Sequence, residues 1–341
     1  MTDATTHPSG PRVAVLGAGS WGTTFAKVLA DGGSHVTIWA RRPELANEIA
    51  VGKRNSDYLP GINLPRTLNA DWRLPAVLEG AEQVYISVPS QSLRANLADV
   101  SPHLDSHAIV VSLMKGVELG TGSRMSQVIA DVLELPANRI AVASGPNLAL
   151  EIAKEMPTAA VVASDDLLTA QTVAATATNP YFRSFVNTDV IGTEFGGVLK
   201  NLIALAIGIV DGVGYGENTK ASILTRGLAE MSAFAAAYGA QPETMSGLAG
   251  LGDLIATSES PLSRNNRAGR LLGQGYSYSE VIASMQQTAE GLASVKPVLE
   301  LARARGVLMP IVEQVGQVLD GTLAPKDLAP HLTTDDVPQG E

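Results

Sequence analysis

The stretch RVAVLGAGSWGTTFAKVL, residues 12–29, decides the fold, because it reads as a strand, a glycine turn and a helix in immediate succession. Arg12–Leu16 is a short apolar run with β-branched side chains, and apolar side chains recur at helical intervals beyond the turn. Between the two, Gly17, Gly19 and Gly22 have the spacing G-x-G-x-x-G. Strand, glycine turn and helix in this order predict the start of a Rossmann-type domain.

Each of these glycines has a physical task in a dinucleotide site. Gly17 permits the tight turn, Gly19 lets the backbone approach a pyrophosphate, and Gly22 lets the helix pack closely on the strand. The pyrophosphate would meet backbone N–H groups and the positive end of the helix dipole. In a chain with 33 glycines the bare motif is weak, so the prediction of a cofactor site depends on the flanking strand and helix.

The end of the next predicted strand, His35–Trp39, bears on the choice of cofactor. An NAD site normally has Asp or Glu there to bind the ribose 2′-hydroxyl, but this chain has Arg41 and Arg42. Two arginines suit a 2′-phosphate, so we expect NADP(H) to be favoured, with NAD(H) possible. The alternatives are two solvated surface arginines, or a ribose contact from Glu44.

Further apolar strands alternate with helical segments. They are expected at Gln83–Val88, His107–Met114, Arg139–Ala143 and Ala159–Ala163. This alternation predicts an α/β fold with a mostly parallel sheet, helices on both of its faces, and ligands at the carboxyl ends of the strands. Lys115 directly follows one such strand, where it could meet an anion. Gly145 and Pro146 follow another, where ordinary turn chemistry explains them equally well.

A second domain is expected because 341 residues exceed what one hydrophobic core usually serves. Beyond about residue 190 the strand pattern gives way to helices. We therefore predict a Rossmann domain at 11–190 and an all-helical substrate and catalytic domain at 191–330. The polar ends, 1–10 and 331–341, are expected to be loose tails.

Lys200 is the unusual member of a long predicted helix, Gly192–Val210. On a helix its neighbours one turn earlier are Gly196 and Gly197, and those one turn later are apolar. Burial on such a face lowers the pKa of a lysine toward values useful for proton transfer, and the glycines leave room for a ligand or a backbone. The alternative is a lysine that extends to solvent at a domain interface.

Two later segments carry further candidates. The glycine-dense passage at 247–252 predicts backbone turns, with Asp253 directly after them. The segment SRNNR at 263–267 offers two guanidinium groups, a hydroxyl and two amides, which suit a phosphate. Taken alone, SRNNR is better explained by a solvated helix start.

The composition, 45% hydrophobic and 17% charged, is that of a globular protein, and a net charge of −10 argues against nucleic-acid partners. The chain has no cysteine, which excludes disulfides and thiolate chemistry. None of its five histidines forms a helical H-x-x-x-H pair, so we expect no metal site. The longest uncharged apolar run, Leu202–Val210, is far shorter than the roughly 20 residues of a membrane span, and no signal peptide is apparent. We therefore expect a cytoplasmic protein without membrane insertion.

Six segments, in the correct order, resemble the bacterial cytosolic NAD(P)-dependent glycerol-3-phosphate dehydrogenases. They are GAGSWGTTFA (17–26), LMKGVE (113–118), SGPNLALE (144–151), GGVLKNLIA (196–204), GLAGLGDL (247–254) and SRNNRAGRLLGQG (263–275). The resemblance covers about residues 12 to 325. It implies reversible reduction of dihydroxyacetone phosphate to sn-glycerol 3-phosphate for phospholipid synthesis, by a homodimer.

The resemblance also implies roles for individual residues. Lys200 matches the catalytic lysine, with Lys115 supporting the oxyanion and Asp253 orienting Lys200 or the substrate. Beside the glycine loop, the cofactor positions are Ser20, Trp21, Arg41, Arg42, Lys115, Ala149, Arg264, Thr288 and Glu290. The substrate positions are Lys115, Gly145, Asn147, Lys200, Asp253, Ser263, Arg264 and Asn265. Asn147 stands where relatives have Thr or Ser, and Thr288 where some have Val.

Two other functions stay open at this point. One is a related two-domain 3-hydroxyacid dehydrogenase, whose substrate carboxylate could use arginine in a similar way. The other is a dinucleotide-sensing protein that binds the cofactor without turnover. The presence of Lys200, Lys115 and Asp253 together argues against the sensing protein.

Overall fold

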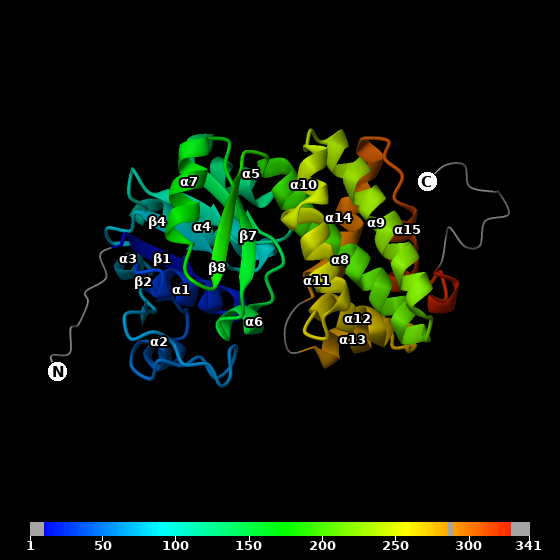
Figure 1. Cartoon of the computed structure of the whole chain (residues 1–341), viewed down its shortest axis with the longest axis horizontal. Coiled ribbons are helices and arrows are strands. Elements are labelled where there is room, and N and C mark those ends of the chain that lie inside the picture. Colours follow the sequence, from blue (N-terminus) through cyan, green and yellow to red (C-terminus); the bar gives the residue numbers. More distant parts are fainter. Residues whose placement is uncertain (1–9, 286–288, 329–341) are drawn as a thin grey trace. The chain divides into compact units, whose positions relative to one another are not determined.

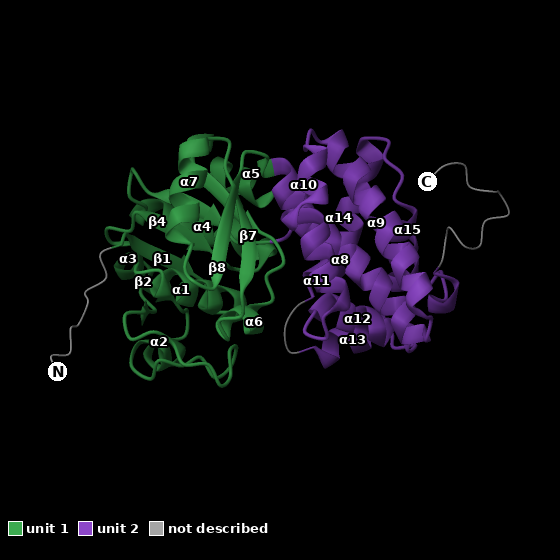
Figure 2. Cartoon of the chain, viewed as in Figure 1, with its two compact units in different colours: residues 1–114, 123–190 green, residues 115–122, 191–341 purple. Residues whose placement is uncertain are grey.

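The computed structural model describes residues 10–285 and 289–328, and these form two compact units (Figures 1 and 2). The first unit consists of residues up to 114 together with 123–190, and the second of 115–122 together with the chain from 191 onward. The change from strands to helices occurs where the sequence pattern placed it. The segment 115–122 belongs to the helical unit, although the sequence suggested two continuous domains.

The first unit contains one eight-stranded sheet in the order β3-β2-β1-β4-β5-β6-β7-β8. The strands are β1 Arg12–Leu16, β2 His35–Trp39, β3 Asn69–Asp71, β4 Gln83–Ile86, β5 Ile109–Ser112, β6 Ile140–Ser144, β7 Thr158–Ala163 and β8 Phe182–Asn187. All neighbouring strands are parallel except β6 and β7. The prediction of a mostly parallel sheet is confirmed, although β3 and β8 were not expected.

Helices cover both faces of this sheet, as predicted. They are α1 Ser20–Asp31, α2 Pro43–Ala50, α3 Leu74–Leu78, α4 Leu93–Val100, α5 Met125–Leu133, α6 Ala149–Ala153 and α7 Leu167–Thr176. Alternate residues of β1 enter two different cores: Val13 and Val15 join one, and Ala14 and Leu16 the other. Because successive strand residues point to opposite faces, an apolar run without alternation gives a sheet buried on both sides.

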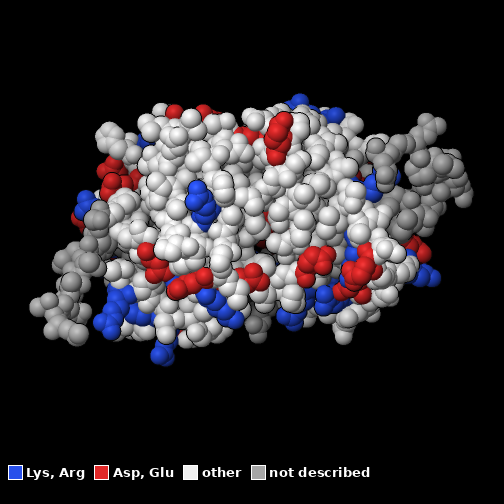
Figure 3. All heavy atoms as spheres, viewed as in Figure 1, with Lys and Arg blue, Asp and Glu red and all other residues white. Residues whose placement is uncertain are grey.

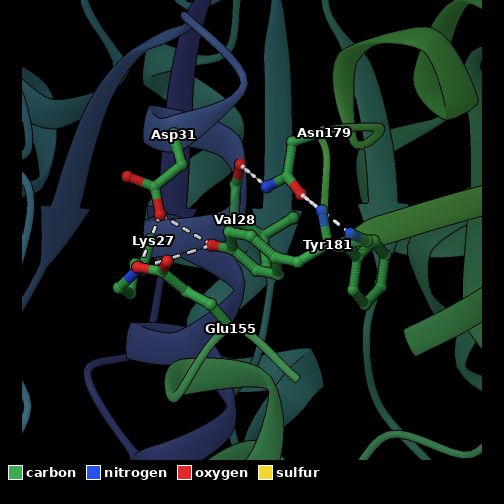
Figure 4. A network of polar contacts seen from close by, with 7 residues as sticks. Lys27, Val28, Asp31, Glu155, Asn179 and Tyr181 are labelled. Atoms are coloured by element: carbon green, nitrogen blue, oxygen red, sulfur yellow. Dashed lines mark hydrogen bonds and ion pairs between the residues drawn. The ribbon is translucent and has the colours of Figure 1, made fainter. Parts of the chain in front are cut away.

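An ion network around the buried Lys27 ties α1 to the later part of the first unit (Figure 4). Nζ of Lys27 donates to Asp31 at 2.6 Å and to Glu155 at 2.8 Å, and the hydroxyl of Tyr181 donates to Asp31 at 2.6 Å. Burial lowers the pKa of Lys27, but the hydrogen bonds to the two carboxylates outweigh it and raise that pKa. The network thus fixes the helix of the glycine loop to residues that flank β7 and β8.

The second unit is helical, as predicted. Its helices are α8 Val190–Val213, α9 Glu217–Ala237, α10 Pro242–Ser246, the π-helical turn η4 Leu248–Gly252, α11 Asp253–Glu259, α12 Arg264–Gly273, α13 Tyr278–Ser284, α14 Glu290–Ala304 and α15 Pro310–Asp320. Among the described helices, α8 alone is long and apolar enough to cross a membrane. Because 83% of its most apolar window is buried inside the protein, it is the central helix of a hydrophobic core.

A buried carboxyl group fixes the start of α15. Glu230 of α9 accepts the backbone N–H of Ile311 at 2.8 Å and that of Val312 at 3.5 Å. The first N–H groups of a helix have no partner within it, so this side chain satisfies them. Burial raises the pKa of Glu230 to about 7, because water no longer stabilises its charge.

Helices α8 and α12 pack backbone against backbone through glycines. A Cβ atom at Gly208 would lie 2.2 Å from the carbonyl oxygen of Asn266, and one at Gly212 would lie 2.2 Å from that of Arg270. From the other side, a Cβ atom at Gly269 would lie 2.2 Å from the carbonyl oxygen of Leu205. These contacts leave no space for any side chain, so the glycines set the separation of the two helices.

We expect Gly208→Ala to lower the free energy of unfolding by about 2 to 3 kcal/mol, because the added methyl must push backbone apart. The matched control is Gly316→Ala in α15, where a Cβ atom would meet its nearest neighbour at an ordinary 3.4 Å. That control should be neutral or slightly stabilising, since alanine favours helix. Urea unfolding of both variants checks this, and equal effects would contradict the packing argument.

Candidate active site

The glycine loop leaves an open space in front of the first turn of α1. Gly17 has φ +116°, and its Cβ atom would lie 2.3 Å from the carbonyl oxygen of Ser87. At Gly22 a Cβ atom would lie 2.0 Å from the carbonyl oxygen of Gly17. At Gly19, by contrast, no atom of the described chain other than those of Gly19 and its two neighbours lies within 4 Å of the Cβ position, and no side chain caps the helix there. Two glycines therefore serve the fold, and the third leaves room that fits a pyrophosphate.

The loop between α2 and β3 holds the glycine loop from outside. Ser20 Oγ donates to the carbonyl oxygen of Tyr58 at 2.7 Å. The amide of Asn55 donates to the carbonyl oxygen of Ala18 at 2.9 Å and to the hydroxyl of Thr23 at 2.8 Å. Asn55 and Tyr58 were not expected from the sequence, because they lie in a segment without helical or strand periodicity.

Further cofactor candidates of the first unit also have defined places. The indole N–H of Trp21 donates to the carbonyl oxygen of Leu113 at 3.1 Å. Ala149 begins α6, and its carbonyl oxygen accepts the hydroxyl of Thr24 at 3.2 Å. Trp21 and Ala149 thus stay close to the glycine loop and its helix.

The two arginines after β2 differ in their surroundings. Arg42 is the residue that precedes the first turn of α2, and its guanidinium pairs with Asp57 at 2.5 Å. The hydrogen bond to Asp57 raises the pKa of Arg42. Arg41 is exposed and has no polar partner within the described ranges. Arg41 is therefore directly available to an anion, whereas Arg42 is already paired.

The loop after β6 contains Gly145 and Asn147. Gly145 has φ +130°, and its Cβ atom would lie 3.2 Å from the Cα atom of Ala160, so the close approach to β7 already favours glycine. Both polar atoms of the Asn147 amide are buried and have no hydrogen-bond partner in the part of the chain that the structure describes. Such a group costs about 1 to 3 kcal/mol unless it is satisfied, which is typical of a position that binds a ligand.

In the second unit, two lysines share one buried carboxylate. Nζ of Lys200 lies 3.0 Å from Oδ1 of Asp253, and Nζ of Lys115 lies 2.5 Å from Oδ2 of the same residue. Thr257 completes the cluster: its hydroxyl lies 2.6 Å from Nζ of Lys200 and 3.2 Å from Oδ1 of Asp253. Thr257 was not expected from the sequence, although Thr257 stands four residues after Asp253 and therefore lies on the same face of α11.

The backbone of η4 brings Asp253 to Lys200. At Gly196, one turn before Lys200 on α8, a Cβ atom would lie 2.4 Å from the carbonyl oxygen of Ala249. The glycine-dense passage therefore packs directly on α8, and Asp253 follows at the start of α11. The sequence suggested that Gly196 leaves room for either a ligand or a neighbouring backbone. In the structure, it is the backbone of Ala249 that lies against Gly196.

This environment lowers the pKa of Lys200 to about 8. Burial is the largest cause, because it removes the water that stabilises the ammonium group. The nearby positive charges of Lys115 and Arg264 act in the same direction, while Asp253 opposes them. A lysine with such a pKa can both give and take a proton near neutral pH.

The SRNNR segment forms the start of α12. Ser263 caps the helix by accepting the N–H of Asn266 at 3.2 Å, as the helix-start interpretation requires. Asn265 is buried, donates to the side-chain oxygen of Asn201 at 2.8 Å and accepts the N–H of Gly291 at 3.0 Å. Arg264, in contrast, is exposed and has no polar partner among the described residues. The first turn of α12 thus combines a rigid base with the available guanidinium of Arg264.

The two remaining candidates lie near the start of α14. Glu290 is the first residue of that helix and is half-buried. Thr288 lies outside the described residues, so its predicted cofactor contact stays a prediction.

Comparison with known sequences identifies the family. A profile described as NAD-dependent glycerol-3-phosphate dehydrogenase N-terminus matches residues 12–170, and the corresponding C-terminus profile matches residues 189–330. The chain belongs to the NAD-dependent glycerol-3-phosphate dehydrogenase family. This confirms the resemblance found in the six sequence segments.

Individual glycerol-3-phosphate dehydrogenases support this assignment. The chain is 72% identical to the glycerol-3-phosphate dehydrogenase [NAD(P)+] of Leifsonia xyli over 96% of this chain and 89% of that protein. It is 55% identical to that of Streptomyces griseus over 92% and 93% of the two proteins. The crystal structure of glycerol-3-phosphate dehydrogenase from Coxiella burnetii superimposes with a TM-score of 0.89 at 36% identity, covering 94% of this chain and 98% of that one.

The contacts of Lys200 predict the pH dependence of this dehydrogenase. With Lys200 as the proposed proton donor, carbonyl reduction needs the protonated lysine, so its rate should fall as pH rises through about 8. Asp253→Asn removes a charge that raises the pKa of Lys200 and should move the midpoint to lower pH. Lys115→Gln removes a charge that lowers this pKa and should move the midpoint to higher pH.

Profiles of kcat against pH for the wild type and both variants check this. Lys296→Gln, at an exposed position of α14, is the control and should leave the midpoint unchanged. If the midpoint moved in the same direction in the Asp253 and Lys115 variants, Lys200 would not be the group that controls the pH profile.

Proposed function

We propose that this chain reduces dihydroxyacetone phosphate to sn-glycerol 3-phosphate, and catalyses the reverse reaction, with Lys200 as the general acid and base. The observation that carries the proposal is the buried lysine whose pKa is lowered to about 8 and which is held by Asp253 and Thr257. A ketone reduction needs a proton at the carbonyl oxygen as hydride arrives at carbon. Family membership makes a triose phosphate the expected substrate.

The charges of the cluster suit this chemistry. Lys115 and Lys200 carry two positive charges against the single negative charge of Asp253. An oxyanion that develops beside them is stabilised, because the donors are already in place and little reorganisation is needed. Lys200 then gives its proton to that oxygen, and Asp253 and Thr257 hold its Nζ in position. In the reverse direction the neutral amine of Lys200 takes the proton of the substrate hydroxyl.

The start of α12 is the proposed phosphate site. Arg264 supplies an exposed guanidinium, which suits bidentate contact with a phosphate. Asn265 is held on both sides by Asn201 and Gly291, so it can position the first turn of α12 without moving itself. Ser263, Gly145 and Asn147 are further proposed substrate ligands.

The cofactor is proposed to bind at the glycine loop of the first unit. The open space at Gly19 fits the pyrophosphate, and Arg41 with Arg42 would meet the adenosine ribose. A bound nicotinamide cofactor would supply the hydride. The relatives are named NAD(P)+ enzymes, which agrees with a site that favours NADP(H) and accepts NAD(H). The proposed domain roles follow: residues 11–190 supply most of the cofactor contacts, and residues 191–330 supply most of the substrate contacts.

We also propose that the protein is a cytoplasmic homodimer that serves phospholipid synthesis. The absence of cysteine suits a reducing cytoplasm. Leu167 and Leu168 of α7 and Phe185 and Val186 of β8 are exposed, and charged side chains are sparse over this part of the first unit (Figure 3). Such an apolar surface suits contact with a second copy.

One assay tests the function. The protein is mixed with NADPH and dihydroxyacetone phosphate, and the nicotinamide absorbance is followed, with a 3-oxoacid as the competing substrate. We expect loss of NADPH with the triose phosphate, whereas loss with the 3-oxoacid alone would favour a 3-hydroxyacid dehydrogenase. In Lys200→Ala, kcat should fall by about 10² to 10⁴, because positioned acid catalysis is lost. Affinity for NADPH should stay unchanged, and a kcat near that of the wild type would refute the role of Lys200.

The cofactor assignment has its own test. Arg41→Asp replaces an available cation by an anion and should lower the ratio of kcat/KM for NADPH to that for NADH. The introduced carboxylate would repel the 2′-phosphate and so weaken the binding of NADPH. The binding of NADH would not change, since NADH has no 2′-phosphate. Arg66→Asp, at an exposed position of the same unit, is the control and should leave the ratio unchanged. An unchanged ratio in Arg41→Asp would remove Arg41 from the 2′-phosphate site.

A further inference from the structure

Three backbone segments of the first unit converge where the adenosine ribose of a dinucleotide would lie. Strands β1 and β2 are in register from Arg12 to Leu16, and the N–H of Gly17 donates to the carbonyl oxygen of Trp39 at 3.3 Å. The glycine loop and the two arginines after β2 are therefore neighbours. The third segment, residues 54–58, is attached to the glycine loop at both ends through Asn55 and Tyr58.

Asp57 lies between these two attachment points and faces Arg42. Its Oδ2 atom is 2.5 Å from a guanidinium nitrogen of Arg42. Both side chains remain about half exposed, at 54% for Asp57 and 55% for Arg42. The carboxylate of Asp57 is thus held beside the arginines that are proposed to bind a 2′-phosphate. Nothing in the sequence pattern had pointed to this segment.

A 2′-phosphate competes with this carboxylate for the same guanidinium. An exposed ion pair is weak, so an incoming phosphate can replace this one. This replacement still costs free energy, because the phosphate must displace the carboxylate of Asp57 from Arg42 and then lie near its negative charge. NADH, which has only a hydroxyl at this position, leaves the Arg42–Asp57 pair intact.

We propose that Asp57 is a positioning residue that limits the preference for NADPH over NADH, by holding Arg42 in an ion pair that a 2′-phosphate must break. The proposal rests on the proposed contact of the two arginines with the ribose. Arg41 and Asp57 then have opposite effects: Arg41 favours the phosphate without any exchange, and Asp57 opposes it. Together they account for a site that uses both cofactors.

The test uses the full-length protein and two nucleotides without nicotinamide, so that no catalysis is involved. Dissociation constants for 2′,5′-ADP and for 5′-AMP, which differ only in the 2′-phosphate, are measured by titration calorimetry, and their ratio reports the preference for a 2′-phosphate. Asp57→Asn keeps the shape and removes the charge, so this preference should rise about fivefold, as expected for the loss of one exposed charge interaction. In the enzyme, the kcat/KM ratio for NADPH to NADH should rise by the same factor, through KM rather than kcat.

Asp131→Asn is the matched control. Asp131 forms the same kind of exposed pair with Arg94, at 2.6 Å, on α5 and α4 of the same unit. This variant should leave both ratios unchanged. In the background of Arg42→Ala, the substitution Asp57→Asn should have less than about twofold effect, because the pair is already absent.

The outcomes separate the inference from the function on which it rests. A wild type that binds 2′,5′-ADP no better than 5′-AMP, with no change in Asp57→Asn, would overturn both the 2′-phosphate site and the role of Asp57. A wild type that prefers 2′,5′-ADP, with the same or a lower preference in Asp57→Asn, would overturn the role of Asp57 alone. A full effect of Asp57→Asn without Arg42 would show that the carboxylate does not act through Arg42, and would also overturn the proposal.

Discussion

The direct contact of backbones around α8 is the constraint on which the second unit depends. Gly196 lets the carbonyl of Ala249 approach one turn before Lys200, and Gly208 does the same for the carbonyl of Asn266 in α12. A helix normally keeps its neighbours 8 to 10 Å away through side chains. Around α8, glycines remove those side chains. The packing against α8 therefore fixes the position of Asp253, which contacts Lys200, and also the position of the first turn of α12, which begins with Arg264. The same close packing also excludes water from Lys200, which is the main reason for its lowered pKa.

Two kinds of electrostatic environment occur in the protein, and they suit different tasks. The Lys115–Asp253–Lys200 cluster is buried, so its interactions are strong, and a change of one charge alters the protonation of the others. The Arg42–Asp57 pair is exposed, so water and salt weaken it and its members can exchange partners. Proton transfer needs the first kind of environment, because the donor must have a defined pKa. Recognition of more than one cofactor is compatible with the second.

Sequence alone predicted the sheet, the helical second unit and most of the candidate site, because these follow from strong local patterns. Gly17, Gly19 and Gly22 could be assigned tasks from spacing, and Lys200 stood out as a charge on an apolar helix face. Thr257 and Asp57 could not be found in this way, since each acts through a partner distant in sequence and carries no periodic signal of its own. Strands β3 and β8 were also missed: β3 has three residues, and β8, at the other edge, mixes polar and apolar side chains. Lys115 was noticed as a residue at a strand end, but its assignment to the helical unit needed three-dimensional contacts.

The place of residues 115–122 bears on how such an enzyme can be divided or recombined. The chain enters the helical unit at Lys115, returns to the sheet unit at residue 123, and enters the helical unit again at residue 191. An exchange of everything after residue 190 between two relatives would therefore transfer Lys200 and Asp253 from one parent and keep Lys115 from the other. The three charges of the cluster come from two separate parts of the sequence, so such an exchange keeps the cluster only where both parents supply it. A single cut in the sequence does not yield the complete helical unit.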